Sequence, residues 1–120
     1  MKKTLLFILL AVTAVSCYWE NEETLFPAGE CDTIDVSYSE DIVQILSFHC
    51  YTCHSNANAL NFGNGITLED YKDVAASSAL VLGSIKHEDG FIPMPRNGEK
   101  LDSCQIMIFE AWVNEGNPDN

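Results

Sequence analysis

The chain has 120 residues, enough for one domain, and its 18 acidic residues against 6 Lys and Arg give a formal net charge of −12. So acidic a surface repels the phosphates of nucleic acids and the head groups of anionic lipids, which excludes nucleic acid as an expected partner. The same charge would attract a protein with a basic docking patch, although plain solubility accounts for it equally well.

The first 16 residues, MKKTLLFILLAVTAVS, have the pattern of a secretory signal. Lys2 and Lys3 precede an apolar run from Leu5 to Val12, and small residues follow. The run is shorter than the about 20 apolar residues that a membrane-spanning helix needs. We therefore expect residues 1–16 to be removed on export, an uncleaved anchor helix being the alternative. Export would place the chain in an oxidising or disulfide-permissive compartment.

The segment AVSC, residues 14–17, resembles the lipobox of bacterial lipoproteins, although Ala14 stands where that pattern usually has leucine. The resemblance implies that Cys17 becomes the lipid-modified first residue of the exported chain. Its acyl chains would then hold the protein on a bacterial membrane, facing the periplasm or the cell surface. The alternative for Cys17 is an ordinary thiol or a disulfide partner.

Residues 17–36 are predicted to be this lipidated cysteine and a tether. The segment YWENEETLFPAGE is acidic, contains a proline and has no sustained apolar period. The folded domain is expected over residues 37–120, where we find no internal repeat.

The domain is predicted to begin with a helix. Ser37 or Ser39 can cap its first turn, and Glu40, three residues after Ser37, favours the positive end. Apolar positions and one histidine then follow a helical period: Ile42, Ile45, Leu46 and His49. This helix leads directly into the segment CYTCH, residues 50–54.

The sequence after CYTCH predicts two further helices separated by irregular segments. Residues 55–65 are rich in Asn and Gly and are predicted to be a loop. A helix is expected to begin at Thr67 and to end near Gly83. Residues 90–98 contain two prolines and two glycines, which exclude a regular element there.

The last helix is predicted to begin after Asp102, which can cap it, and to end at Gly116. Its buried positions are expected to be Ile106, Phe109, Trp112 and Val113. Because no segment alternates as a strand does, we predict an all-α domain. A domain this small buries little apolar surface and usually needs a disulfide or a cofactor.

CYTCH has the C-x-x-C-H spacing of covalent haem attachment. Each thiol can add across one of two neighbouring vinyl groups, and the imidazole directly after the second thiol can then bind the iron. A zinc site needs four ligands, for which His49, His87 or Cys104 would have to be recruited. A thioredoxin-like dithiol needs a preceding strand, and a helix is predicted instead.

Residues 37–118 resemble a small monohaem cytochrome c, particularly the exported bacterial kind attached to lipoproteins. The resemblance rests on CYTCH, on Met94 between two prolines in FIPMP, and on the helix IMIFEAWVNEG. It implies a cytochrome c-like bundle of about three to four helices around one covalently attached haem c. Cys50 and Cys53 would carry the thioether bonds, His54 would be the proximal iron ligand and Met94 the distal one.

The resemblance implies electron transfer between redox partner proteins, with no catalytic residues, so the chain is expected not to be an enzyme. A weakly ligated or open sixth position would instead make it a haem-based gas sensor or peroxidase. His87 competes with Met94 as sixth ligand. We expect His49 to be a surface or haem-edge residue and Met107 to be a packing residue.

The same resemblance implies that the first and last helices cross, which would bring Cys31 and Cys104 together. A disulfide between them would close a loop of about 74 residues and stabilise the fold by about 4 kcal/mol. The alternative is two unpaired thiols.

Overall fold

The computed structural model describes residues 31–96 and 98–120. The predicted signal segment, the predicted lipidation site Cys17 and the predicted tether as far as Glu30 lie outside the described residues. In the part described, the secondary structure is helical and contains no strand. The elements are η1 (Tyr38–Ile42), α3 (Val43–His49), α4 (Tyr51–His54), α5 (Ala59–Phe62), α6 (Tyr71–Lys86) and α7 (Ser103–Asn114). The all-α prediction is confirmed.

The first helical segment begins at Ser37, as its capping pattern predicts. The Ser37 hydroxyl accepts a hydrogen bond from the backbone N–H of Glu40 at 3.3 Å. The π-helical turn η1 continues directly into α3. Three of the predicted apolar positions in these two elements are buried, namely Ile42, Ile45 and Leu46. This segment therefore anchors the chain in the core immediately before CYTCH.

Helix α6 begins at Tyr71, and the prediction that it begins at Thr67 is wrong. The backbone N–H of Leu68 donates to the carbonyl of His54 at 2.9 Å, and the side chain of Leu68 is buried. Asp70 has extended backbone angles and takes the N-cap position. Because the chain before Tyr71 is bound to the CYTCH segment, it cannot also form the first turn of the helix.

The far end of α6 and the loop after CYTCH also differ from expectation. Helix α6 continues through Gly83 to Lys86, with His87 as its C-cap. A single helical turn, α5, forms within residues 55–65, where a loop was predicted. Residues 90–96 and Gly98 contain no helix or strand, in agreement with the two prolines there.

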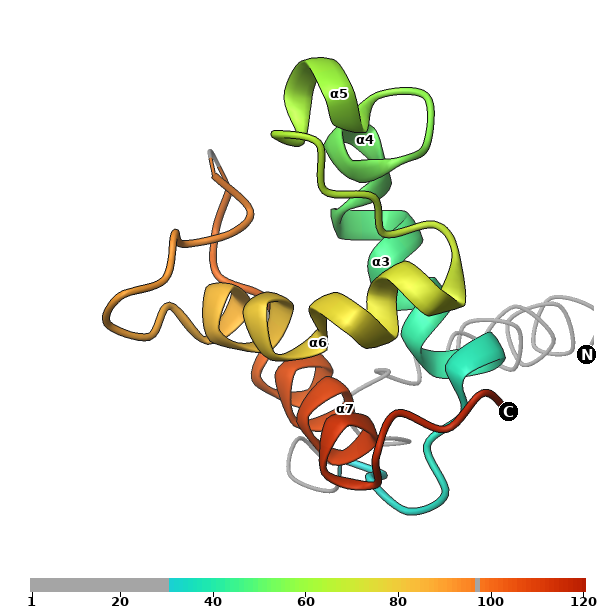
Figure 1. Ribbon diagram of the computed structural model, residues 1–120. Coiled ribbons are helices and arrows are strands. Elements are labelled where there is room, and N and C mark those ends of the chain that lie inside the picture. Colours follow the sequence, from blue (N-terminus) through green and yellow to red (C-terminus); the bar gives the residue numbers. More distant parts are fainter. Residues whose placement is uncertain (1–30, 97) are drawn as a thin grey trace, which may run out of the picture. The chain divides into compact units, whose positions relative to one another are not determined.

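Helix α7 supplies the centre of the core. Asp102 caps it by accepting a hydrogen bond from the N–H of Cys104 at 2.8 Å, as predicted. Phe109 and Trp112 are completely buried. In Figure 1, α7 packs on the side of α6 that faces away from α4 and α5. The α7 part of the core therefore lies on one side of α6, with α4 and α5 on the other, and Cys50 and Tyr51 of CYTCH pack against the core cluster.

Aromatic rings and the C-terminal residues close this core around η1. The ring of Tyr38 lies 5.0 Å from that of Tyr71 and 5.6 Å from that of Trp112. The N–H of Tyr38 donates to Asn120 Oδ1 at 2.8 Å, and the N–H of Ser39 donates to the Asn120 carbonyl at 3.0 Å. The two ends of the domain are thereby held together.

Cys31 and Cys104 form a disulfide, with 5.4 Å between their Cα atoms. The bond fixes the segment before η1 to the first turn of α7. Accordingly, the compact unit runs from Cys31 to Asn120, whereas the sequence places its start at Ser37. Among the residues described, no helix is both long enough and apolar enough to cross a membrane.

Candidate functional site

The CYTCH segment occupies the junction between α3 and α4. The N–H of Cys50 donates to the carbonyl of Leu46 at 2.8 Å and so continues the ladder of α3. The N–H groups of Cys53 and His54 both donate to the carbonyl of Cys50, at 3.1 and 2.8 Å. The two thiols and the imidazole therefore belong to one helical turn, with a rigid helix leading into it.

The imidazole of His54 is oriented by a bond to the backbone. Its Nδ1 lies 2.9 Å from the carbonyl oxygen of Ile66. Because a carbonyl only accepts, Nδ1 must carry the proton, and the lone pair of the neutral ring is then on Nε2. Iron-ligating and zinc-ligating histidines are held in this way, with the second nitrogen bonded to a carbonyl or carboxylate. Nε2 is therefore the nitrogen of His54 with a lone pair available to bind a metal ion.

Gly63 allows the chain after α5 to pack directly against this imidazole. A Cβ atom at Gly63 would lie 2.6 Å from the carbonyl oxygen of Cys53 and 2.8 Å from Nδ1 of His54. Such distances are shorter than van der Waals contact permits, so any side chain there would displace the ring. The glycine after α5 thus lies against the same edge of the His54 ring that bonds to the Ile66 carbonyl.

The two thiols of CYTCH are free and lie in different environments. Cys50 is partly buried and Cys53 is exposed. Burial, and secondly the nearby Cys53, raise the pKa of the Cys50 thiol to about 11. Dithiol oxidoreductases depend on a cysteine whose pKa is lowered, so that a thiolate is present near neutral pH. The environment of Cys50 has the opposite effect and does not favour that chemistry.

The zinc alternative requires four donors around one point. Across residues 31–96 and 98–120, no three His, Cys, Asp or Glu side chains form a group that could hold a metal ion. His49, one of the residues that could be recruited, accepts a hydrogen bond on Nε2 from the Gln105 amide at 3.1 Å. Cys104 is in the disulfide.

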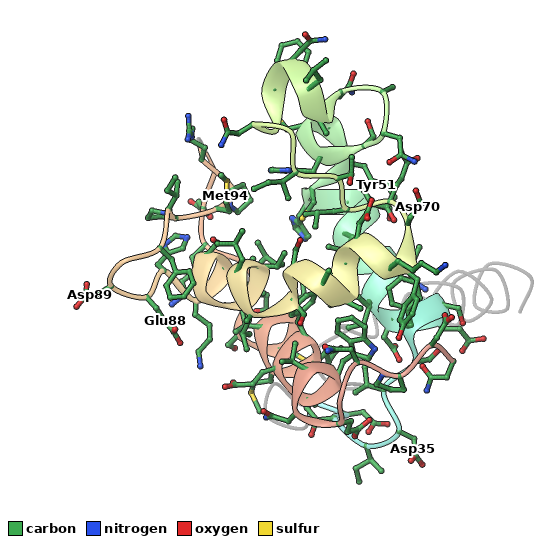
Figure 2. The ribbon with its side chains drawn as sticks, viewed as in Figure 1. Asp35, Tyr51, Asp70, Glu88, Asp89 and Met94 are labelled. Carbon is green, nitrogen blue, oxygen red and sulfur yellow. A yellow bond between two sulfur atoms is a disulfide. The ribbon has the colours of Figure 1, made fainter. Side chains whose placement is uncertain are left out.

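Met94 lies on the irregular segment between α6 and α7. Figure 2 shows it near the tip of this segment, on the same side of α6 as Tyr51 of α4. The side chain is partly buried. The backbone N–H of Met94 donates to the carbonyl of Ser84 at 3.1 Å, which ties the segment to the last turn of α6. Met94 is thus fixed to α6 on the side of this helix where α4 lies.

The remaining ligand candidates have other surroundings. His87 Nε2 lies 3.0 Å from the carbonyl oxygen of Met94, so this nitrogen must be the protonated donor. His87 Nε2 is therefore engaged with the Met94 backbone.

The expectation that Met107 is a packing residue is wrong, because 49% of this residue is exposed on α7.

Large apolar side chains are exposed on the segments that carry these residues. Phe48 in α3 is 84% exposed, Leu60 and Phe62 in α5 are 85% and 70% exposed, and Ile92 is 56% exposed. Single exposed apolar residues are ordinary, but several on neighbouring elements are typical of a surface that a ligand or partner covers. The CYTCH side of α6 therefore offers apolar surface beside its polar candidates.

Three residues of this site were not expected from the sequence: Gly63, Ile66 and Ser84. Ile66 and Ser84 act through their backbone carbonyls, which every residue type has, so no sequence signal marks them. Gly63 belongs to the glycine pair of FGNG, which predicts a turn but not a close approach to His54.

Comparison of the chain with family models, with curated proteins and with solved structures finds no match. The assignment of a function therefore depends on the geometry of CYTCH and Met94.

Proposed function

We propose that this chain is an electron-transfer protein with one covalently attached haem c. In this proposal Cys50 and Cys53 carry the thioether bonds, His54 is the proximal iron ligand and Met94 is the distal one. When bound, the haem supplies an iron that changes between the ferric and ferrous states. The fold would accordingly be a cytochrome c-like bundle.

The hydrogen bond from His54 Nδ1 to the Ile66 carbonyl is the observation that carries the proposal. His54 follows directly after a C-x-x-C pair on one helical turn, and the hydrogen bond leaves its Nε2 as the basic nitrogen. A structural histidine has no need of two free thiols within the preceding four residues. A c-type haem needs this combination of two thiols and one oriented imidazole.

The other residues fit a haem as well. The thiols of Cys50 and Cys53 are not bridged to each other, so both can react with vinyl groups. The exposed side chains Phe48, Leu60 and Phe62 supply apolar surface that a porphyrin could cover. The thioether of Met94 is a soft donor that favours ferrous iron and raises the reduction potential relative to a second histidine.

Each residue has a separate task in this function. The bond to Ile66 keeps the His54 ring in one tautomer and one orientation, so the proximal ligand would not rearrange during a redox change. The attachment of Met94 to α6 limits the movement of the distal ligand. Small reorganisation at both ligands favours electron transfer over the binding of exogenous molecules.

The proposal extends to partners and location. The acidic chain would dock on redox proteins with a basic patch, and this attraction is screened over roughly 10 Å at 0.1 M salt. Electron-transfer rates should therefore fall as salt rises. A lipid on Cys17 would hold the exported protein on a membrane, facing the periplasm or the cell surface.

Intact mass and an absorption spectrum test the proposal directly. The full chain is produced in a host that matures c-type haem. Its intact mass is measured after denaturing purification, which removes any haem held without a covalent bond, and its spectrum is recorded on protein purified in the folded state. We expect the mass of the polypeptide with its processing plus one haem, and a low-spin ferric spectrum with a sulfur-to-iron charge-transfer band. A colourless product of polypeptide mass would contradict the proposal.

Met94→Ala separates electron transfer from the sensor or peroxidase alternative. If Met94 is the distal ligand, the variant loses the charge-transfer band, has a lower potential and binds carbon monoxide readily in the ferrous state. If the unmodified protein is already high-spin and binds carbon monoxide, the sixth position is open and the alternative holds.

A further inference from the structure

Both backbone polar groups of Met94 are bonded to the C-terminal turn of α6. The N–H donates to the carbonyl of Ser84 at 3.1 Å, and the carbonyl accepts from Nε2 of His87 at 3.0 Å. The peptide groups on both sides of the Met94 Cα are thus fixed to one helix. Only the side-chain torsions of Met94 would then have to become ordered when its sulfur binds a metal.

Phe91 fixes the same segment at a third point. A Cβ atom at Gly83 would lie 2.6 to 2.7 Å from three atoms of the Phe91 ring, so the ring lies directly against the helix backbone. The N–H of Glu88 also donates to the Gly83 carbonyl at 3.0 Å. We call Gly83, Ser84, His87 and Phe91 together the Met94 clamp.

The backbone of His87 is left-handed, with φ of 56° and ψ of 43°. Gly adopts this conformation freely, and Asn, Asp and His adopt it more readily than other residues do. Of these four residue types, only histidine can place a donor as far from the backbone as imidazole Nε2. The bond to the Met94 carbonyl therefore distinguishes histidine from the other three at this position.

We propose that His87 is a positioning residue for the sixth ligand and is not itself a ligand. Its Nε2–H holds the Met94 backbone so that the thioether is in place before it meets iron, which reduces the ordering that ligation requires. This inference rests on the proposed function. It predicts that the clamp keeps exogenous ligands from displacing Met94.

His87→Gly in the haem-loaded protein tests the inference, because glycine retains the left-handed backbone and removes the donor. The readouts are the affinity of the ferric protein for imidazole, the sulfur-to-iron charge-transfer band and the reduction potential. We expect imidazole to bind about tenfold more tightly, the factor that corresponds to one net hydrogen bond of about 1.4 kcal/mol. The band should weaken and the potential should fall.

Three further variants make the result specific. In His87→Gln, the amide Nε2 stands as many bonds from Cβ as the imidazole Nε2 does, so this variant should restore most of the imidazole resistance. Gly83→Ala should raise the imidazole affinity in the same direction, because its Cβ displaces the Phe91 ring. Asp89→Ala removes an exposed side chain two residues after His87 and should leave the affinity unchanged.

Failure of this inference differs from failure of the proposed function. Unchanged imidazole affinity and band in both His87→Gly and Gly83→Ala would overturn the clamp while Met94 remains the ligand. An unmodified protein that lacks the sulfur band and changes its spectrum in His87→Gly would make His87 the ligand. A chain that carries no haem would end both proposals. Should His87→Gly not accumulate, Gly83→Ala and His87→Gln decide.

Discussion

The two sides of α6 are built in different ways. On one side, Phe109 and Trp112 of α7 are completely buried, and the Trp112 ring packs against those of Phe109 and Tyr38. On the other side, Leu60 and Phe62 of α5 are 85% and 70% exposed. The aromatic side chains of α7 are thus buried within the protein, whereas the large apolar side chains of α5 are left in solvent.

The hydrogen bonds differ in the same way. On the α7 side they close the fold, as in the bond from the Trp112 indole to the Pro118 carbonyl at 2.9 Å. On the CYTCH side they orient single residues, His54 through Ile66 and Met94 through Ser84 and His87. The difference teaches that the α7 side closes the fold, while the CYTCH side orients His54 and Met94 and leaves the thiols of Cys50 and Cys53 free.

The strongest test of this comparison is to remove the thiols on the CYTCH side. In Cys50→Ala/Cys53→Ala we expect complete loss of covalent haem, because thioether bonds require these sulfurs. Intact mass after denaturing purification measures the loss. Cys31→Ser/Cys104→Ser is the matched control, since it also removes two cysteines and should retain the haem. Covalent haem in the first variant would contradict the attachment site.

Although it should retain the haem, Cys31→Ser/Cys104→Ser should destabilise the fold, because it removes the disulfide that ties the segment before η1 to α7. Cys31→Ser/Cys104→Ser opens a loop with a sequence separation of 73 residues, so the free energy of unfolding should fall by about 4 kcal/mol. Urea unfolding of the haem-loaded protein under non-reducing conditions measures this change. A loss of less than about 1 kcal/mol would mean that the disulfide hardly restricts the unfolded chain.

The same Leu→Ala substitution can be made at a buried leucine and at an exposed one, which compares the two environments. Leu46 in α3 is 1% exposed, and Leu46→Ala should lower the free energy of unfolding by about 3 kcal/mol. Leu60 in α5 is 85% exposed, and Leu60→Ala should change it by about 0.5 kcal/mol or less in the chain without haem. Urea unfolding measures both.

Repeating the leucine pair with haem attached sharpens the comparison. If the cofactor covers the exposed apolar surface, the cost of Leu60→Ala should rise while that of Leu46→Ala stays about the same. Equal costs for Leu60→Ala in both forms would remove α5 from the surface that the cofactor covers.

The smallest effect concerns Tyr38, and it appears only at high pH. Burial, and secondly nearby Tyr51 and Asp119, raise the pKa of Tyr38 from 10.0 to about 12. The unfolded chain then loses this proton at lower pH than the folded one, so the stabilisation is full below pH 10 and is lost between about pH 10 and 12.

Tyr38→Phe isolates this contribution. The Tyr38 hydroxyl is buried and makes no hydrogen bond within the described chain, so the variant should be nearly as stable at neutral pH. Its stability should fall less steeply above pH 10 than that of the unmodified protein. Thermal unfolding at a series of pH values compares the two, and identical slopes would contradict the raised pKa.

Local sequence patterns predicted the parts of the fold that depend on local structure. The caps at Ser37 and Asp102 and the buried positions Ile106, Phe109 and Trp112 follow from residue type and helical period, and all are found. Val113 is only partly buried, at the edge of the predicted stripe. The spacing of CYTCH likewise places both thiols and His54 on one turn.

The rest depends on contacts between segments far apart in the sequence. The late start of α6 results from the bond between Leu68 and His54, and the position of Met94 results from Ser84 and His87. Such contacts use backbone groups or a single side chain, neither of which produces a periodic signal. The sequence predicts that His87 competes as a ligand, because an imidazole can bind iron. It does not reveal that this imidazole bonds to the backbone carbonyl of Met94.

The disulfide also makes the part of the chain that contains the candidate site a closed covalent ring. Cys50, Cys53, His54 and Met94 all lie between Cys31 and Cys104 in the sequence. A single proteolytic cut anywhere in this ring leaves both fragments joined through sulfur. As long as the disulfide stays oxidised, a nicked molecule would therefore keep all four of these residues on one particle.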